Sequence, residues 1–392
     1  MKISILCCNL SNNAMGRSYL LAKILQRRFR VEIVGPVFGR SIWPALADRR
    51  DVPIKPVYFD HPPHSYRQIG ELLDLMNGDV LYANKTFFSS FGLALLKKFR
   101  YKKTVVLDID DWDLGFALYK LSRQSPKGLI KTFGRWFLEL PRFYQSDKIC
   151  SLYCFEKLAV FADAITVSNT FLQKKFGGTL IPHVRDADIF NPALFDSQAL
   201  RAELGIDHRL KIAGFIGTPR AFKGVEDLLE AAVRTSRQDL AVMVVGMDVE
   251  DAYCQKIERV GRRLLGPRFI SFGPQFFESL PKFLAVCDVV VIPQRKTLAT
   301  KGQIPAKLFD AMAMAKPIVA TDVNDIGQIL TGCGRVVSPG DIEQIAEAIS
   351  FYLSDPRQAE QTGWLARQKC IEKYSLNSAQ PVLTDVFGRF EK

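Results

Sequence analysis

Four aspartates lie close together at the end of an apolar run, in the segment VVLDIDDWDLGF. They are Asp108, Asp110, Asp111 and Asp113, and the residues Thr104–Asp108 read as a buried strand. Carboxylates at Asp-x-Asp spacing can hold a divalent cation or bind a hydroxyl group. The alternative is that these acids are exposed and cap the helix that follows. Both interpretations place the acids at the carboxyl end of a strand.

A basic loop is the second candidate, in the segment GFIGTPRAFKGVEDLLEAA. A strand is predicted to end at Gly217, and Arg220 and Lys223 precede Gly224, where a helix begins. Two cations beside a free helix N-terminus suit a diphosphate. An isolated pair of this kind is usually solvated surface charge, but the flanking glycines and the strand end favour binding.

The segment VVVIPQRKTLATKGQIPAKLFDAMAMAKPIVAT holds the third candidate. Pro305 fits the first turn of a helix. Asp310 follows in that helix among apolar residues, and Lys307 lies on roughly the same face. Asp310 could accept two hydrogen bonds from vicinal hydroxyls of a ligand, face solvent, or pair with Lys307.

The loop SNNAMGRSYLLAKIL after the first predicted strand contains Gly16, which would let the backbone approach a ligand at a helix start. A tight strand-to-helix turn explains this glycine equally well. A dinucleotide fingerprint needs three glycines at fixed spacing, so a hydride-transfer enzyme is not supported.

Short Val- and Ile-rich runs alternate with helical patterns along the whole chain, which predicts parallel sheets covered on both faces. The predicted strands are Ile3–Asn9, Val31–Val34, Asp79–Tyr82, Thr104–Asp108, Ala164–Val167, Thr179–Ile181, Lys211–Ile216, Leu240–Val245, Phe269–Phe272, Asp288–Ile292, Pro317–Ala320 and Arg335–Val337. The predicted helices include Arg17–Arg28, Val225–Thr235, Ser279–Val286 and Ile342–Leu353. The pattern predicts two Rossmann-like, doubly wound α/β domains with a boundary in Asn191–Ser197. Ligands of such domains bind at the carboxyl ends of the strands, so a cleft between the two domains is expected to hold the site.

Charge is unevenly distributed in this chain of 392 residues, whose net charge is +12. Residues 1–195 contain 28 Lys and Arg against 17 Asp and Glu, whereas residues 196–392 contain 25 against 24. A basic half suggests a polyanion, an anionic membrane surface or an acidic substrate. No apolar run approaches the roughly 18 residues of a spanning helix.

The eight cysteines are scattered, and Cys150 and Cys154 have no second ligand pair, so we expect reduced thiols in a cytoplasm rather than a zinc site.

Several of these motifs, in this order, resemble the GT-B glycosyltransferases of family 4, which are retaining enzymes. From Gly214 to about Tyr374 the chain resembles their nucleotide-sugar-binding domain, with Gly217, Lys223 and Gly224 at the family's glycine and lysine positions. The segment DAMAMAKPIVA resembles the family's Glu-Ala-Met-Ala-x-Gly-x-Pro-Val-Val-Ala element, and CGRVVSPGD its Gly-x-Val-Val-x-Pro-Gly-Asp segment. In the first half, ADAITVSNTFLQKKFGGTLIPHVRDADIFNP resembles the interdomain passage.

The resemblance implies a donor-binding role for a set of residues in both halves. Lys223 becomes a diphosphate ligand and Asp310 the acceptor for the ribose hydroxyls, while the loop at Gly16 approaches the donor. Thr218 stands where the family has arginine, and Arg220 can supply that charge. The first acid of the family's acidic-x7-acidic pair falls at Gly302, so Gln303, Lys307 and backbone amides near Gly302 are expected to take over part of its role.

The resemblance also implies the reaction, which is transfer of a sugar from a nucleotide-diphosphate sugar to a polysaccharide, lipid-linked or other glycan acceptor. Retention is expected, without a metal or a further cofactor. Relatives often read Asp-x-His-Asp at the acidic segment, so Asp110 or Asp111 is predicted near the acceptor hydroxyl or the anomeric carbon. The predicted domains are 1–195 on the acceptor side, 196–375 for the nucleotide sugar, and a carboxyl-terminal helix, 376–392, packing back on the first domain.

Two basic segments, 91–103 and 117–148, combine Lys and Arg with aromatic residues. The second has Leu129, Ile130, Phe133, Trp136, Phe137 and Leu140 at helical spacing. Such a stretch suits an anionic bilayer, which predicts a cytoplasmic protein peripheral on the membrane, although an ordinary packed helix fits as well.

Two other classes of function remain. A sugar-nucleotide epimerase or a phosphorylase could use the same two-domain fold, but neither has a distinct motif here. Nucleic-acid binding would use the basic charge, but no known module is present, so no nucleic-acid partner is predicted.

Overall fold

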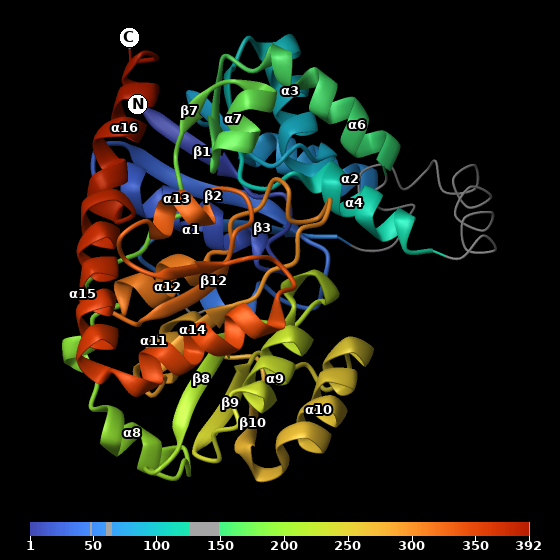
Figure 1. Cartoon of the computed structure of the whole chain (residues 1–392). Coiled ribbons are helices and arrows are strands. Elements are labelled where there is room, and N and C mark those ends of the chain that lie inside the picture. Colours follow the sequence, from blue (N-terminus) through green and yellow to red (C-terminus); the bar gives the residue numbers. More distant parts are fainter. Residues whose placement is uncertain (48, 60–64, 125–148, 392) are drawn as a thin grey trace. The chain divides into compact units, whose positions relative to one another are not determined.

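The computed structural model describes residues 1–47, 49–59, 65–124 and 149–391 (Figure 1). The chain divides into two compact units, each built on a parallel sheet. Unit 1 consists of Met1–His183, Lys301–Gln303 and Ala379–Lys392, and unit 2 of Val184–Thr300 and Ile304–Ser378. In the described part of the chain, no helix is long and apolar enough to cross a membrane.

Unit 1 has a seven-stranded sheet in the order β3-β2-β1-β4-β5-β6-β7. Its strands are β1 (Lys2–Leu6), β2 (Arg30–Val37), β3 (Ile54–Tyr58), β4 (Val80–Asn84), β5 (Thr104–Ile109), β6 (Ala164–Val167) and β7 (Thr179–Leu180). Its helices are α1 (Ala14–Leu25), α2 (Ser65–Leu75), α3 (Leu93–Tyr101), α4 (Asp113–Ser122), α6 (Ile149–Leu158), α7 (Thr170–Phe176) and most of α16 (Leu376–Gly388). All neighbouring strands are parallel, as predicted.

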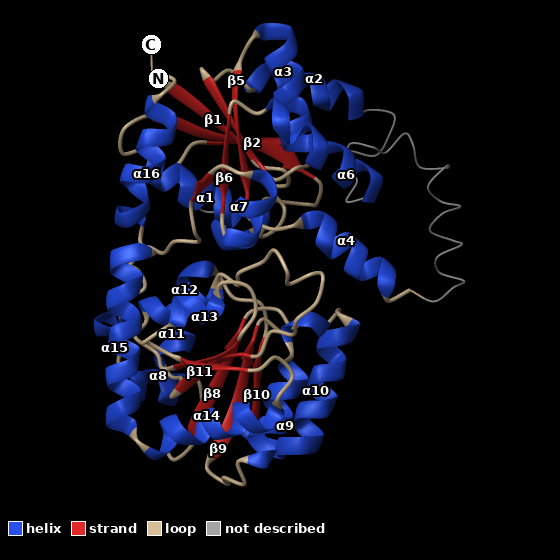
Figure 2. Cartoon of the chain, turned by 45° about the horizontal axis from the view of Figure 1, so that its top comes forward, coloured by secondary structure: helices blue, strands red, loops and turns tan. Residues whose placement is uncertain are grey.

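Unit 2 has a six-stranded sheet in the order β10-β9-β8-β11-β12-β13. Its strands are β8 (Lys211–Ile216), β9 (Leu240–Val245), β10 (Phe269–Phe272), β11 (Val289–Ile292), β12 (Ile318–Thr321) and β13 (Arg335–Val337). Its helices are α8 (Ser197–Glu203), α9 (Val225–Arg234), α10 (Ala252–Leu265), α11 (Leu280–Ala285), α12 (Lys307–Ala313), α13 (Ile326–Leu330), α14 (Ile342–Ser354) and α15 (Pro356–Lys373). Figure 2 shows the strands of each sheet with helices on both faces.

The sequence pattern explains why these elements form. All six residues of β9 are buried, as expected of a strand with helices on both faces. In α9 the buried residues Val225, Leu228, Leu229 and Ala232 recur at helical spacing, so one face packs on the sheet. No strand was predicted from the sequence at Ile54–Tyr58, and this was wrong, because β3 lies there. This strand contains Pro56, which lacks a donor, and β3 lies at the edge of the sheet, where proline is tolerated.

The division between the units lies at His183–Val184, earlier in the chain than the predicted boundary in Asn191–Ser197. The physical reason is a bridge at Arg185, whose N–H donates to Tyr374 O at 2.8 Å and whose carbonyl accepts from Leu376 N at 3.1 Å. At the other end of the chain, Ala379–Lys392 groups with unit 1, where Phe387 packs against the ring of Tyr82. Of the predicted amphipathic segment 117–148, residues 125–148 lie outside the described residues.

Candidate functional sites

The sheet of unit 1 changes winding direction between β1 and β4, and a charged cluster lies beside this point. Lys85 follows β4 directly, and its Nζ lies 2.8 Å from Asp110, 3.1 Å from Asp111 and 3.4 Å from Asp113. The three carboxylates come from the end of β5 and the start of α4. Lys85 has a left-handed backbone (φ 68°), a strained conformation for a lysine, and its side chain is about 10% exposed. One ammonium group therefore holds together three of the four aspartates that the sequence singled out.

The carboxyl groups of this cluster differ in their protonation. Burial opposes ionisation of Asp110, but the charges of Lys85, His183 and Arg17 outweigh it and lower its pKa to about 2. Burial raises the pKa of Asp111, and the neighbouring Asp110 adds to the rise. Burial also raises the pKa of Asp113, to about 7, despite the charge of Lys85. At neutral pH the cluster therefore combines an ionised carboxylate with a carboxyl group that retains a proton part of the time. It can both accept hydrogen bonds from a hydroxyl group and donate one.

Asp108 is completely buried and has a structural role. Its carboxylate accepts hydrogen bonds from Arg17 Nε at 3.1 Å, Asn84 Nδ2 at 3.0 Å and Thr166 Oγ1 at 2.8 Å. Arg17 also donates to the carbonyl of Ile181 at 2.8 Å. The network links α1 to β4, β5, β6 and the end of β7, and so fixes the strand ends beside the Lys85 cluster.

Two predicted donor residues, Gly302 and Gln303, group with unit 1. The carbonyl of Gly302 accepts from Trp112 N at 3.2 Å and from Asn169 Nδ2 at 3.2 Å. A Cβ added to Gly302 would lie 2.5 Å from Cβ of Trp112, which explains why no acid stands here. Gln303 Nε2 donates to Asp111 at 3.3 Å, so this amide belongs to the Lys85 cluster. A direct role of either residue toward a donor stays a prediction.

Gly16 lies within the first turn of α1 and not in the preceding loop. A Cβ added there would meet the ring of Trp43 at 3.5 Å, an ordinary contact, so neither space nor conformation requires glycine. Its predicted approach to a donor therefore has no steric support in unit 1.

Asp113→Asn is expected to make the folded protein more stable above pH 7, by about 1 kcal/mol or more. A carboxyl group whose folded pKa is raised from 3.8 to about 7 lowers stability progressively as the pH rises from 4 to 7, and asparagine removes this loss. Urea unfolding at pH 5, 6, 7 and 8 measures the difference, which should grow with pH.

Asp51→Asn provides the matched control. Burial opposes ionisation of Asp51, but hydrogen bonds from Tyr19 and Lys23 lower its pKa. Its stabilising effect is complete above the unfolded pKa and is lost only as the pH falls through the folded pKa, so the variant should lose a constant amount of stability between pH 5 and 8. A difference for Asp113→Asn that is equally flat would show that Asp113 is ionised throughout.

Unit 2 has a second site where its own sheet changes direction, between β8 and β11. Gly217 follows β8 with φ 123°, a conformation that side chains rarely adopt. Gly224, which precedes α9, has φ 65°, and a Cβ there would lie 2.0 Å from Pro293 O. Both glycines are therefore required by the backbone, which confirms that this loop is tightly folded at the strand end.

Two lysines converge on this loop. Lys223 Nζ donates to Thr218 O at 2.7 Å. Lys307 Nζ is buried, has no hydrogen-bond partner among the described residues, and lies 3.3 Å from the centroid of the Phe215 ring. A Cβ on Gly217 would be 3.2 Å from Lys307 Nζ, so the ammonium lies against this glycine. Burial, followed by the charge of Lys223, lowers the pKa of Lys307 well below its usual value. An unpaired buried ammonium group beside a second lysine favours the binding of an anion at this loop.

The other two predicted residues of this region are engaged in ion pairs. Arg220 donates to Asp251 at 2.8 Å, and Asp251 also caps α10. Asp310 is buried and accepts a hydrogen bond from Arg185 Nε. The guanidinium of Arg185 also donates to Ala306 O at 3.0 Å, which ties the start of α12 to the chain entering unit 2. Asp310 pairs with Arg185 and not with Lys307, so the predicted intrahelical pair is absent from the described structure.

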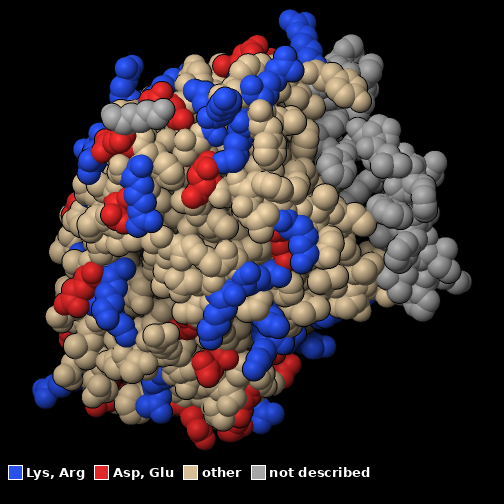
Figure 3. Space-filling model, turned by 90° about the horizontal axis from the view of Figure 1, so that it is seen from above, with Lys and Arg blue, Asp and Glu red and all other residues tan. Residues whose placement is uncertain are grey.

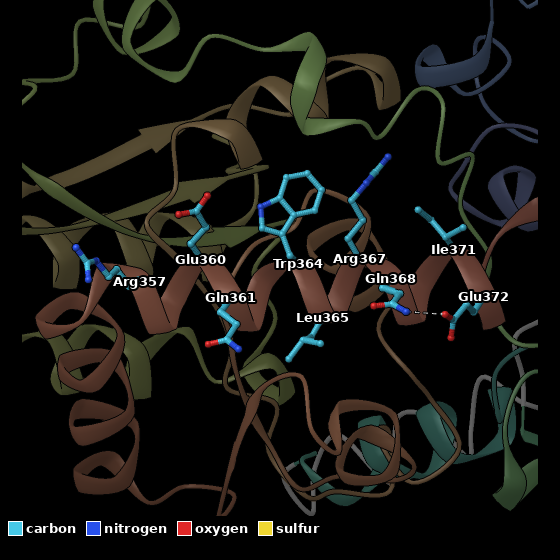
Figure 4. A pocket seen from close by; sticks show the side chains of 9 residues that line it. All are labelled: Arg357, Glu360, Gln361, Trp364, Leu365, Arg367, Gln368, Ile371 and Glu372. Atoms are coloured by element: carbon cyan, nitrogen blue, oxygen red, sulfur yellow. Dashed lines mark hydrogen bonds between the residues drawn. The ribbon is translucent and has the colours of Figure 1, made fainter.

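Two pockets lie in unit 2. One is at the carboxyl edge of the sheet, beyond β9 and β10, and is lined by Met247, Asp248, Val249, Cys254, Gln255, Glu258, Arg259, Ser271, Phe272 and Gly273. It adjoins the lysine site, because a Cβ on the neighbouring Gly246 would lie 2.9 Å from the carbonyl carbon of Gly217. The other runs along α15 (Figure 4). Among the described residues, no group of three or more His, Cys, Asp or Glu side chains is placed to hold a metal ion.

Sequence reasoning missed Lys85 and Arg185. Lys85 stands in the segment LYANKTFF, where no motif marks it, and its only signal is its place directly after a predicted strand. Arg185 lies in the segment that resembles the family's interdomain passage, but no role was predicted for this arginine from the sequence. Their partners are distant in the chain, so only the fold brings them together.

Comparison with known proteins finds a family model that matches part of unit 2. Residues 210–355 match the model of glycosyl transferases group 1. This segment of unit 2 is therefore similar to that family. The matched segment includes the lysine site of unit 2, from Gly217 to Asp310.

Curated proteins align with part of the chain. Alpha-D-kanosaminyltransferase of Streptomyces kanamyceticus is 30% identical over 200 residues, which cover 49% of this chain and 50% of that protein. The putative colanic acid biosynthesis glycosyl transferase WcaI of Escherichia coli is 24% identical over 280 residues, 69% of this chain and 65% of that protein. The chain spans about half the length of the first curated relatives that it matches.

Solved structures match the whole chain. Anabaena Alr3699/HepE in complex with UDP-glucose has a TM-score of 0.76 at 17% identity, over 99% of this chain and 100% of that chain. Sucrose-phosphate synthase from Thermosynechococcus elongatus has a TM-score of 0.73 at 15% identity, over 99% and 98%. These likenesses confirm the predicted fold class, the two-domain GT-B fold.

Proposed function

We propose that this chain is a glycosyltransferase that moves a sugar from a nucleoside-diphosphate sugar to a glycan or lipid-linked acceptor, with retention and without a metal. The observation that carries the proposal is the unpaired, buried ammonium of Lys307 beside Lys223 and Gly217. A diphosphate is the ligand that would pair with both lysines at this strand end. The pocket beyond β9 and β10 adjoins the lysines and offers space for the nucleoside.

The chemistry follows from where charge develops. The bond between the anomeric carbon and the phosphate oxygen breaks as the acceptor oxygen bonds to that carbon. The sugar gains oxocarbenium character, and negative charge collects on the leaving diphosphate. Lys307 and Lys223 stabilise this charge more as the bond breaks, and the departing phosphate oxygen takes the proton of the acceptor hydroxyl. Asp310, held by Arg185, is the proposed acceptor for ribose hydroxyls.

The Lys85 cluster serves the sugar side of the reaction. Asp110 is ionised and can stabilise positive charge on the sugar or accept from its hydroxyls, and Asp111 binds Gln303 beside it. A sugar hydroxyl needs both donors and acceptors, and the cluster offers both. The relatives whose names specify kanosaminyl, mannosyl or glycosyl transfer support a hexose as the transferred group.

A panel of nucleotide sugars, beginning with UDP-glucose, tests the proposal. Thermal stabilisation of the full chain by each nucleotide sugar and its nucleoside diphosphate identifies the donor. Release of nucleoside diphosphate is then measured with a membrane extract as the source of acceptor. An epimerase on the same fold would convert the donor sugar without any acceptor. If no nucleotide sugar of the panel stabilises the protein, the proposed transferase function is contradicted.

A membrane-bound acceptor is supported by the surface of α3 and the neighbouring turn Ala159–Phe161. Phe99 is 63% exposed and packs against the ring of Phe161 at 5.6 Å. Lys97 and Arg100 lie over the exposed ring of Tyr101, at 4.7 and 5.6 Å. Figure 3 shows Lys and Arg side chains interspersed with Asp and Glu over one face of the molecule. Aromatic rings with adjacent cations suit the headgroup region of an anionic membrane, and we place the enzyme on the cytoplasmic face.

Reversal of charge at α3, in the double variant Lys97→Glu/Arg100→Glu, is expected to lower binding to anionic liposomes at least fivefold at low salt. Each basic residue near such a surface contributes about 1 kcal/mol. Flotation with vesicles with and without anionic lipid measures the effect. The matched control is Arg259→Glu/Arg263→Glu on α10 of unit 2, which should bind as the wild type does. If both double variants float to the same extent, α3 is not part of the membrane-binding surface.

A further inference from the structure

The helix α15 carries an apolar stripe on its outward face. Its inner face is buried and consists of Ala359, Thr362, Gly363, Ala366, Arg367 and Cys370. On the opposite side, Trp364 is 50% exposed, and Leu365 and Ile371 are each 44% exposed. The exposed side chains of this outward face, together with the buried Arg367, line the pocket that Figure 4 shows. Large apolar side chains grouped on one exposed helix face are typical of a surface that another molecule covers.

The spacing of this face fits a partner that is itself a helix. Arg357, Gln361, Trp364, Gln368 and Ile371 follow one another at intervals of four, three, four and three residues. This alternation keeps the five side chains on one face of the helix, where Trp364 and Ile371 supply the apolar contacts and the other three are polar. A membrane or a small ligand does not require such a repeat.

The charges indicate that the partner is a second copy of the same helix. Arg357 lies at the start of α15 and Glu372 near its end, and the midpoint between them falls between Trp364 and Leu365. If two copies pack antiparallel about this midpoint, Arg357 of each copy lies opposite the other copy's Glu372. Gln361 then lies opposite Gln368, and the apolar pair occupies the centre. In a twofold interface every such contact occurs twice.

Arg357 and Glu372 are both available to form an ion pair with a second copy. In the described part of the chain no ion pair involves Arg357 or Glu372, and Glu372 accepts one hydrogen bond, from Gln368 at 3.0 Å. Fifteen residues of helix separate them by about 22 Å, so they cannot reach each other within one chain.

We propose that two copies of this chain associate through α15, antiparallel and about a twofold axis at Trp364 and Leu365. The helix is about 27 Å long, and one helix pair buries less than the roughly 1,200–2,000 Å² of a stable interface. The dimer is therefore weak and forms at micromolar concentration. The proposal is independent of the transferase function, because α15 lies outside both candidate sites.

A charge-reversal cycle tests the proposal by sedimentation equilibrium of the full chain between about 1 and 100 µM. Arg357→Glu and Glu372→Arg each place like charges opposite one another twice, and each is expected to weaken the dimer at least tenfold. The double variant Arg357→Glu/Glu372→Arg restores both pairs and should return the dissociation constant to within about threefold of the wild type. Restoration can arise only between copies, because the two residues are too far apart within one.

Trp364→Glu, which places two carboxylates at the axis, should leave only monomer. All four variants carry substitutions only at exposed positions and should keep the far-UV circular dichroism and the melting temperature of the wild type. A wild type that stays monomeric over the whole range overturns the proposal. A dimer that Trp364→Glu leaves intact, or a double variant as weak as the single ones, overturns it as well.

Discussion

Lys307→Met is expected to make the protein more stable and at the same time to weaken its binding of nucleoside diphosphates about 100-fold or more. The Lys307 ammonium is buried without a hydrogen-bond partner among the described residues, and a buried unpaired charge lowers stability. The Phe215 ring offsets part of this loss, but methionine keeps favourable contact with the ring. Removing one charged ligand of a diphosphate typically costs about 3 kcal/mol, so affinity should fall about 100-fold or more.

The same lysine predicts a proton effect. Burial, followed by the charge of Lys223, lowers the pKa of Lys307 well below its usual value in the free protein. A bound diphosphate raises that pKa again because its negative charge favours the ammonium form. Binding should therefore take up a proton, which isothermal titration calorimetry measures as an enthalpy that depends on the ionisation enthalpy of the buffer.

Lys316→Met is the matched control for Lys307→Met. Lys316 is also a buried lysine of unit 2 with a pKa lowered chiefly by burial, but its Nζ donates to Ala285 O at 2.7 Å and to Cys287 O at 3.0 Å. Its replacement leaves two carbonyl groups without this donor, so stability should fall while affinity for the diphosphate is unchanged. If Lys307→Met binds within twofold of the wild type, the lysine site is not the donor site.

The contrast between these two lysines shows what the sequence could predict. Gly217, Lys223 and Gly224 were found from the sequence because a strand end, two cations and a helix start occur within one short segment. Lys307 was found only through its position before Asp310, and its unpaired state could not be foreseen. Whether a buried charge has a partner depends on residues that the fold brings near, which for Lys307 include Phe215 and Gly217.

The fold was more predictable than the contacts within it. Continuous apolar runs such as β8 and β9 were predicted with the bounds that the structure has, since burial on both faces leaves a plain signal in the sequence. β3 was missed because an edge strand can contain a proline, as it does at Pro56. The pairing of Asp310 with Arg185 was missed for a different reason, which is that 125 residues separate them.

Asp110→Asn is expected to lower kcat about 100-fold or more while the affinity for the donor's diphosphate stays the same. Asp110 has a pKa of about 2 and is therefore ionised throughout the working range, 2.8 Å from Lys85. An ionised carboxylate in a buried site stabilises positive charge on the reacting sugar strongly, whereas an amide of the same size does not. The diphosphate-binding lysines lie in unit 2, so an effect on turnover alone would assign Asp110 to the sugar and separate the roles of the two sites.

Asp163→Asn controls for the loss of a carboxylate from the same sheet. Asp163 precedes β6, pairs with Lys98 near the surface and accepts a hydrogen bond from Val105 N at 2.8 Å. Its replacement should cost some stability but leave kcat within about twofold, because partly exposed ion pairs contribute little. If Asp110→Asn behaves as Asp163→Asn does, the Lys85 cluster is structural, and the group that stabilises the sugar must lie elsewhere. If Asp110→Asn instead weakens donor binding with kcat unchanged, the carboxylate holds the donor in its ground state and takes no part in the transition state.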